Sequence, residues 1–495
     1  MFEAVIVKLG ALLALFRYPE VSLLLLALLL LIMESFSSDE KKSSFIGPVA
    51  MIGLLGVLIL SFVFPLSEGV HWEGLYAVDH LAIFFKRFFL VATLLVLWMS
   101  LPYERRLSFS QGEFFIMPLF PTIGMLLLSS AQDFTLIFVA LELVTISFYV
   151  LVAFQRNEGA SLEAGVKYLI IGALSTAFLV YGIAFLFGTV GSTRLVEISV
   201  YLVDHEVTAA LLLAAIGIVV GLGFKIAAVP FHIWAPDVYQ GAPTPVTAFL
   251  AISSKAAGFL VLLRLFAFDG FGVSMMDKYS HAIFGLLAGF TVLLGNLAAL
   301  PQRNIKRLMG YSSIGHAGFL LFGLAAVSDR GNQATLLYLI LYAIAAVLAF
   351  FIICHLSEQL GGDDLSKYSG LSRRAPLSAF GLLVAFISMA GVPPLAGFVG
   401  KFSVLAAVWE TDVANQTVGQ ESYLLLSCGL IAAVIGLYYY LGIVRQMYWS
   451  EPLGDAPKVE LPLAGQVLVI VLSIGLIVLG INQQPIMDIL ALITG

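Results

Sequence analysis

The chain alternates long apolar stretches with short polar segments. A helix needs about 20 mostly apolar residues to cross the hydrocarbon core of a bilayer, and by that measure the sequence contains fourteen spans. They centre on residues 20–33, 46–64, 81–101, 113–130, 134–154, 163–187, 209–229, 244–267, 281–300, 312–327, 333–356, 377–409, 422–445 and 462–482. The first and tenth spans are short, and Pro393 and Pro394 interrupt the twelfth. The pattern predicts an all-α, polytopic bundle of transmembrane helices.

The composition supports the same fold class. The chain is 60% hydrophobic and 11% charged, whereas a soluble domain carries roughly 25% charged residues. Its net charge of -6 is spread thinly, so we expect no nucleic-acid partner. Cys354 and Cys428 lie in apolar runs without metal-ligand spacing, and we expect small buried side chains there. The first apolar run leads into Glu34 without a cleavage site typical of signal peptides.

The Lys and Arg residues of the loops predict the orientation, because cytoplasmic loops are enriched in both. With fourteen spans, one side holds thirteen of them: Lys41, Lys42, Arg105, Arg106, Arg156, Arg303, Lys306, Arg307, Lys367, Arg373, Arg374, Arg445 and Lys458. The other side holds five: Lys8, Arg17, Arg194, Lys278 and Arg330. This asymmetry predicts that both termini face the non-cytoplasmic side.

Several ionisable residues fall inside predicted spans. A charged side chain at the bilayer centre costs at least about 2.5–3.5 kcal/mol, and such residues are functional candidates. Glu142 lies eight residues into its span, which is roughly 12 Å deep at the rise of an α-helix. Three lysines lie at comparable depth or beside prolines that break a helix. We therefore predict a proton relay made of Glu142, Lys225, Lys255 and Lys401.

The prolines strengthen this prediction. Pro230 has no amide hydrogen, so we expect the carbonyl of Ile226, next to Lys225, to lack a helical partner. Interrupted helices are tolerated in lipid where they line a polar or protein-filled cavity. Two charges about 10 Å apart at an effective dielectric constant near 20 interact by roughly 1.7 kcal/mol, which biases proton occupancy more than tenfold. Neighbouring groups of this kind can therefore control one another's protonation.

Three further residues have two interpretations each. Lys167 lies near the start of its span, one turn after Glu163, and it is either part of the relay or an interface lysine paired with that carboxylate. His232 and His316 either relay protons or make structural hydrogen bonds.

Other basic residues in the spans favour an anchoring role. Arg264 approaches the outer end of its helix with Asp269 beyond it, and we expect its side chain to extend to the interface. Lys86 and Arg87 flank the start of a span and are predicted to anchor it there.

The two proline breaks lie in the seventh and twelfth spans. These spans are five apart, and an odd number of crossings reverses the direction of the chain. Two successive five-helix units would therefore lie inverted in the membrane, as is common in secondary transporters. This predicts N-terminal helices over 1–112, a first antiporter-like repeat over 113–268, a second inverted repeat over 281–446 and a C-terminal helix over 447–495.

Three long stretches carry a family resemblance. Residues 224–259 (FKIAAVPFHIWAPDVYQGAPTPVTAFLAISSKAAGF), 302–323 (QRNIKRLMGYSSIGHAGFLLFG) and 391–402 (GVPPLAGFVGKF) resemble the antiporter-like membrane subunits of proton-translocating NADH-quinone oxidoreductase, respiratory complex I. The run LELVTISFYVLVAF resembles the branch of subunit N, the counterpart of mitochondrial subunit 2. Lys401 also fits that branch, because subunit M carries glutamate at this place.

The resemblance implies roles for the buried residues. Glu142 matches the fifth-span glutamate of the family, which forms the central charge pair with the lysine at Lys225. Lys255 matches the connecting lysine, and Lys401 the terminal lysine that exchanges protons with one side. Lys167 matches a sixth-span lysine of subunit N, which favours its place in the relay.

The resemblance also implies an assembly and a location. The chain would be a translocase subunit without a redox centre, with FMN and iron-sulfur clusters on other subunits. Its partners would be antiporter-like subunit M, small helical subunits and lipid, in a bacterial inner membrane. A multisubunit cation/proton antiporter and an energy-converting membrane hydrogenase use similar subunits and remain alternatives, as does a purely structural membrane scaffold.

Overall fold

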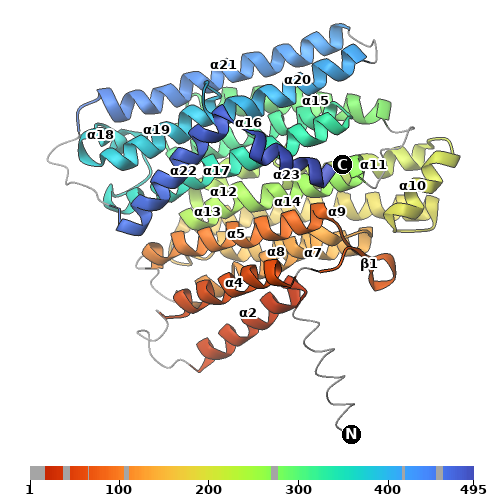
Figure 1. Ribbon diagram of the computed structural model, residues 1–495, viewed down its shortest axis with the longest axis horizontal. Helices are drawn as coiled ribbons and strands as arrows, with labels where there is room; N and C mark the ends of the chain where they lie inside the picture. The colour runs from red at the N-terminus through yellow and green to blue at the C-terminus, as the bar shows by residue number, and fades with distance from the viewer. Residues whose placement is uncertain are drawn as a thin grey trace.

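The computed structural model describes residues 17–36, 45–64, 66–104, 111–268, 277–414, 419–452 and 461–494. Its helices lie side by side in one elongated bundle (Figure 1). The N-terminal helices α2 (Pro19–Ser35) and α4 (Ile46–Val63) lie at one edge, and α20 (Ala396–Ala414) and α21 (Gln420–Trp449) lie at the opposite edge. The predicted helical membrane fold is confirmed.

Eleven helical segments among the described residues are long and apolar enough to cross a membrane, and they match eleven of the fourteen predicted spans. Besides α4 and α21 they are α5 (His80–Tyr103), α6 (Gln111–Ile116) with α7 (Leu119–Ser130), α8 (Phe134–Val152), α9 (Gly159–Val190), α13 (Thr244–Phe249) continued by η3 (Leu250–Ser254), α14 (Lys255–Leu263) and η4 (Arg264–Phe268), α15 (Asp277–Ala299), α16 (Ile305–Ala325), α17 (Asp329–Gln359) and α22 (Leu463–Ile481).

The other three predicted spans are shorter or broken. They correspond to α2, to α11 (Ala209–Lys225) with α12 (Trp234–Gly241), and to α19 (Pro376–Ala390) with α20. The count of fourteen therefore stays a prediction. The tenth span is longer than expected, because α16 begins at Ile305 with Asn304 as its N-cap. The first turns of this helix contain polar residues, so their hydropathy is too low to predict a membrane span.

Both predicted breaks are present, and both contain a cis proline, after Val229 and after Pro393. The first break begins earlier than expected: α11 ends at Lys225, and Ile226 is already its C-cap. The indole of Trp234 donates to the carbonyl of Phe224 at 3.2 Å, and the backbone N–H of Ala227 donates to the same carbonyl at 3.0 Å.

The second break depends on a glycine. Gly391 is the C-cap of α19 and has a φ of +84°, a backbone conformation that residues other than glycine rarely adopt. A Cβ at this position would also lie 2.8 Å from Cδ of Lys401. Gly391 thus ends the helix and leaves room for the lysine.

Some elements were not predicted, because they are too short for a span. Strands β1 (Gly69–His71) and β2 (Tyr76–Val78) form an antiparallel hairpin around η1 (Trp72–Gly74), with Val70 opposite Ala77. The hairpin and α10 (Leu195–Asp204) lie at one end of the bundle, and α18 (Leu371–Arg374), preceded by η5 (Leu365–Tyr368), lies at the other (Figure 1). Helix α23 (Gln484–Thr494) follows α22.

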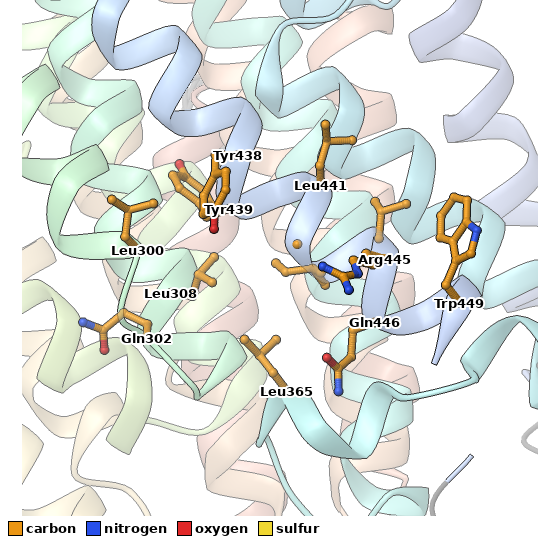
Figure 2. Close-up of a pocket in the computed structure, with 13 residues that line it drawn as sticks. Leu300, Gln302, Leu308, Leu365, Tyr438, Tyr439, Leu441, Arg445, Gln446 and Trp449 are labelled. Carbon is orange, nitrogen blue, oxygen red and sulfur yellow. The ribbon is translucent and has the colours of Figure 1, made fainter. Parts of the chain in front are cut away.

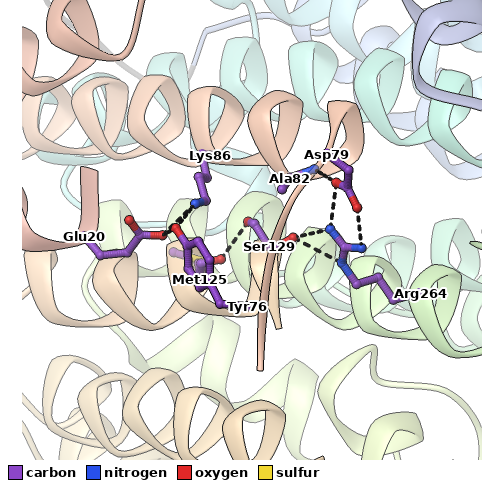
Figure 3. A network of polar contacts seen from close by, with 8 residues as sticks. All are labelled: Glu20, Tyr76, Asp79, Ala82, Lys86, Met125, Ser129 and Arg264. Atoms are coloured by element: carbon purple, nitrogen blue, oxygen red, sulfur yellow. Dashed lines mark hydrogen bonds and ion pairs between the residues drawn. The ribbon is translucent and has the colours of Figure 1, made fainter. Parts of the chain in front are cut away.

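Lys86 is not an interface anchor, as we had expected, but a member of a buried ion pair (Figure 3). Its Nζ lies 2.8 Å from Oε1 of Glu20, and both side chains are about 95% buried. The hydroxyl of Tyr76 donates to the same carboxylate oxygen at 3.0 Å, and Lys86 donates to that hydroxyl. The cluster joins α2, α5 and the hairpin. Arg87 is half-buried and donates to the carbonyl of Ser61 at 3.0 Å, so its anchoring role stays a prediction.

The prediction for Arg264 was also wrong. Its side chain is 1% exposed and points into the protein, where two guanidinium nitrogens lie 2.8 and 2.9 Å from the carboxylate oxygens of Asp79 (Figure 3). Its Nε donates to the carbonyl of Ser129 at 3.1 Å. Asp79 is also the N-cap of α5, because its carboxylate accepts a hydrogen bond from the backbone N–H of Ala82. A hydropathy pattern could not reveal these partners, which are distant in sequence.

Some predictions fall outside the described residues. These concern the outer-end position of Asp269 and the loop or terminal positions of Lys8, Lys41, Lys42, Arg105, Arg106 and Lys458.

Glu20→Gln tests the buried pair. The substitution leaves the Lys86 ammonium buried without its counter-charge, and breaking such a pair costs about 3–5 kcal/mol. We expect a lower apparent melting temperature of the detergent-solubilised protein. Glu197→Gln is the matched control, because Glu197 and Arg194 form a pair with side chains 52% and 45% exposed, and exposed pairs contribute about 1 kcal/mol or less. Equal effects of the two substitutions would contradict a stabilising role for the buried pair.

Candidate functional site

The structure brings Glu142 and Lys225 together. Glu142 projects from α8 and Lys225 from the end of α11, and Nζ of the lysine lies 3.9 Å from Oε1 of the carboxylate. Thr176 donates to that oxygen at 2.8 Å, and Lys225 donates to the hydroxyl of Thr145. The lysine side chain is 6% exposed and the glutamate 22% exposed. The predicted charge pair is thus present inside the bundle.

The break in the seventh span gives Lys225 its position. Lys225 is the last residue of α11, and the C-terminus of a helix carries a partial negative charge that stabilises a cation. The lysine therefore meets the helix end, the Thr145 hydroxyl and the carboxylate of Glu142. Together these groups replace part of the hydration that the ammonium loses on burial.

Lys255 lies in a different environment. It follows η3, a π-helical turn, which is a rare conformation found frequently at functional sites. Its Nζ donates to both the carbonyl and the hydroxyl of Ser313. That hydroxyl also lies 3.0 Å from the hydroxyl of Tyr239 and accepts from Tyr342 at 3.2 Å. No described acidic residue forms an ion pair with Lys255, so hydroxyls rather than carboxylates surround it.

His316 continues this polar region. Its Nδ1 lies 2.6 Å from the hydroxyl of Tyr338, and its Nε2 lies 3.2 Å from the hydroxyl of Tyr440. Tyr440 is also hydrogen bonded to Ser312. Because Ser312 and Ser313 are adjacent on α16, the contacts of His316 lie next to those of Lys255. The structure thus places His316 in a buried hydrogen-bond network.

Lys401, on α20, is 6% exposed and lies beside the second break. Its Nζ donates to the carbonyl of Ala390 at 3.0 Å, and it lies 4.7 Å from the ring centroid of Phe319, within range of a cation–π contact. Asn296 and Lys401 both lie near Gly436. A Cβ atom added to this glycine would be 3.2 Å from Oδ1 of Asn296 and 3.9 Å from Nζ of Lys401.

The comparison with known proteins identifies the family. The family model described as NADH:quinone oxidoreductase/Mrp antiporter, transmembrane, matches residues 131–436. The chain belongs to this family. The match includes Glu142, Lys225, Lys255 and Lys401 and both broken helices, and it ends shortly before Tyr439 and Tyr440.

Full-length relatives indicate the branch. The chain is 40% identical to NADH-quinone oxidoreductase subunit N of Desulforamulus reducens over 444 residues, which is 90% of each protein. It is 38% identical to subunit N of Moorella thermoacetica over 450 residues, covering 90% of this chain and 91% of the relative. Within the antiporter-like family, the resemblance is therefore to subunit N.

Solved structures agree with the family and the fold. A chain of respiratory complex I from Thermus thermophilus superimposes with a TM-score of 0.78 at 31% identity, covering 96% of this chain and 100% of that one. A chain of the Mrp complex from a Dietzia species gives a TM-score of 0.83 at 19% identity, covering 97% and 96%. The second match shows that the fold is shared with antiporter subunits.

Lys167 lies apart from the three buried lysines of this antiporter-like chain. Its side chain is 42% exposed, and its Nζ lies 2.6 Å from Glu163 and 2.8 Å from Asp237. The pairing with Glu163 is as predicted. Arg307 binds the other oxygen of Asp237, so Lys167 belongs to a half-exposed cluster of charges. Its participation in a relay stays a prediction.

His232 remains equally open. It lies in the linker between α11 and α12 and is half-buried, and among the described residues its Nδ1 has no hydrogen-bond partner. Neither the relay nor the structural interpretation is tested by this geometry. No described group of three or more His, Cys, Asp or Glu residues is placed to hold a metal ion.

The prediction from sequence missed the hydroxyl and amide groups that lie next to the buried lysines and His316. These are Thr145, Ser312, Ser313, Tyr440 and Asn296. Their signal is weak because serine, threonine and tyrosine are common in membrane helices. The run YSSIGH, with two hydroxyls just before a histidine, was the strongest available indication.

The different exposures of the lysines can be tested by chemical labelling. We expect a water-soluble amine-acylating reagent to modify Lys167 in the native protein and to spare Lys225, Lys255 and Lys401, because these three are at most 7% exposed. After denaturation all four should react, which is the control for their intrinsic reactivity. Peptide mass spectrometry measures the modified fraction. Equal native modification of Lys255 and Lys167 would contradict the buried geometry.

Proposed function

We propose that this chain is the proton-translocating subunit N of an NADH-quinone oxidoreductase. Its role is to couple electron transfer from NADH to quinone with proton movement through buried side chains. The main support for this proposal is the Glu142–Lys225 pair. Nζ of the lysine lies 3.9 Å from Oε1 of the glutamate, in a chain that belongs to the antiporter-like family. The relatives at 38–40% identity are named subunit N of this enzyme.

The first step of the proposed mechanism uses the charge pair. The carboxylate of Glu142 stabilises the ammonium of Lys225, at about 4 Å and therefore with a substantial Coulomb energy. When Glu142 takes up a proton or loses contact with the lysine, that stabilisation is lost. The ammonium then releases its proton toward the polar groups further along the bundle. The charge of one residue thus controls the protonation of the next.

The second step uses hydroxyl groups. A hydroxyl donates one hydrogen bond and accepts others, so it can receive a proton on one side and release one on the other. Ser313 contacts Lys255, and Tyr440 links Ser312 to His316. Lys255 has no described counter-charge to hold it permanently protonated. We therefore assign it the connecting role, with His316 as a member of the same relay.

Lys401 would complete the relay. It lies next to the second broken helix and close to the amide of Asn296, whose oxygen accepts from Tyr439 at 3.1 Å. A break exposes backbone carbonyls such as that of Ala390, which hold the ammonium without a carboxylate. This arrangement suits a residue that exchanges its proton with one side of the membrane.

The proposed domain division rests on the spacing of the two broken helices. We propose that residues 113–268 and 281–446 form two inverted repeats, each with a lysine beside a break that contains a cis proline. Residues 1–112 and 447–495 would flank them. We also propose that the membrane is a bacterial inner membrane and that both termini lie on its non-cytoplasmic side, which is the side with fewer loop Lys and Arg residues.

The redox chemistry would take place elsewhere in the complex. FMN and iron-sulfur clusters would be bound by other subunits, while antiporter-like subunit M and small helical subunits would contact this chain in the membrane.

The second candidate function is that of a subunit of a cation/proton antiporter, because the Mrp chain has the same fold. At 19% identity, against 40% for subunit N, it is less well supported. Nothing specific favours a hydrogenase subunit.

Lys225→Met and Glu142→Gln test the proposal. Each removes one charge of a pair worth several kcal/mol at an effective dielectric constant near 20, so we expect proton pumping to fall by at least about tenfold. The assay is proton uptake into sodium-free vesicles that contain the intact complex, normalised to assembled complex. Lys367→Met is the matched control, because Lys367 lies in a loop turn outside the spans. Normal pumping by assembled Lys225→Met complexes would favour a purely structural role.

Tyr440→Phe tests the hydroxyl part of the relay. The substitution keeps the ring but removes the group that contacts both His316 and Ser312. Each of these hydrogen bonds is worth about 1 kcal/mol, so we expect pumping to be at least about fivefold slower. Tyr423→Phe is the control, because Tyr423 is 58% exposed. If both variants pump at the same rate, the relay does not pass through Tyr440.

A further inference from the structure

A cavity of about 630 Å³ opens between the ends of α15 and α16 and the last turns of α21 (Figure 2). Its lining on α21 runs from Tyr438 to Trp449, which is about 16 Å along a helix axis. One leaflet of a bilayer has a hydrocarbon thickness of roughly 15 Å, half that of the whole core. The cavity therefore has the length of one leaflet.

The cavity is amphipathic. Leu300 and Leu441, which are 40% and 43% exposed, contribute to a mainly apolar wall. Arg445 is the one charged residue of the lining and is exposed, with no hydrogen-bond or ion-pair partner among the described residues. Figure 2 shows its guanidinium group between Leu441 and Gln446, among the other lining side chains.

Two aromatic side chains border this opening. Tyr438 is 75% exposed and Trp449 is 74% exposed. Aromatic residues with a polar atom are enriched where a membrane protein meets the lipid headgroups. Arg445 also belongs to the end of the bundle that carries most of the loop Lys and Arg residues.

We propose that this cavity binds one anionic phospholipid. The phosphate of its headgroup would pair with the guanidinium of Arg445, because an arginine without a protein partner matches the charge of a phosphate. An acyl chain would lie along Leu300 and Leu441, where it would replace contact with bulk lipid. Charge complementarity and an apolar wall of leaflet length together favour this occupant over a helix of another subunit.

The position of the site gives it a consequence for the polar interior. Tyr439 lines the cavity, and its hydroxyl donates to Asn296 at 3.1 Å. Asn296 in turn lies near Lys401. A bound lipid would therefore pack against the outer side of Tyr439 and separate these polar groups from the exterior of the bundle.

Photo-crosslinking in the intact complex tests the proposal. Benzoylphenylalanine replaces Tyr438, and the complex is placed in nanodiscs that contain equal amounts of phosphatidylglycerol and phosphatidylcholine. After irradiation, mass spectrometry of the α21 peptide identifies the adducts. We expect about fivefold more phosphatidylglycerol than phosphatidylcholine adduct, the preference that one basic side chain gives near a membrane surface.

Matched variants assign that preference to the guanidinium. Arg445→Gln should bring the adduct ratio close to one, whereas Arg445→Lys should retain most of it. Arg373→Gln removes an exposed charge at the same end of the bundle, outside the cavity lining, and should leave the ratio unchanged. An equal ratio with Arg445 present, an adduct on a peptide of another subunit, or the absence of a lipid adduct would each overturn the proposal.

Discussion

The structure depends on one constraint: amines that lie deep in an apolar bundle must find compensating polar groups without water. Lys225 meets a carboxylate, a hydroxyl and a helix end, while Lys255 meets a serine and Lys401 a free carbonyl. The three solutions differ in strength, because, of these three lysines, only Lys225 has a carboxylate as a partner among the described residues. The free energy of holding a proton therefore differs from one lysine to the next.

The breaks in the seventh and twelfth spans follow from the same constraint. A continuous helix uses all of its internal backbone groups, so it offers none to a buried ammonium. Because α19 ends at Ala390, the carbonyl of this residue is available to Lys401, and the end of α11 at Lys225 places that lysine beside Thr145 and Glu142. The apparent irregularities of the fold are therefore part of the polar interior, and the surrounding helices supply the packing.

Sequence reasoning predicted the helical fold, both breaks and the buried charges at Glu142 and Lys225, because apolar length and buried charge are local signals. The pairing of these two residues was implied by the family resemblance. Sequence reasoning was wrong about Lys86 and Arg264, whose partners Glu20 and Asp79 come from distant segments. A charge near the end of a span is compatible with either lipid headgroups or a buried partner, and periodicity cannot separate the two. The hydroxyl groups beside the lysines were missed because serine, threonine and tyrosine are too common in membrane helices to stand out.

Helix α16 has a position that joins the two halves of the polar interior. Ser313 contacts Lys255, Ser312 contacts Tyr440, and His316 follows one turn later. Because these residues share one rigid element, a small rotation of α16 about its axis would change the contacts on both sides at once. The surroundings of Lys255 and of His316 are therefore coupled through the backbone of one helix, in addition to any direct contact between side chains.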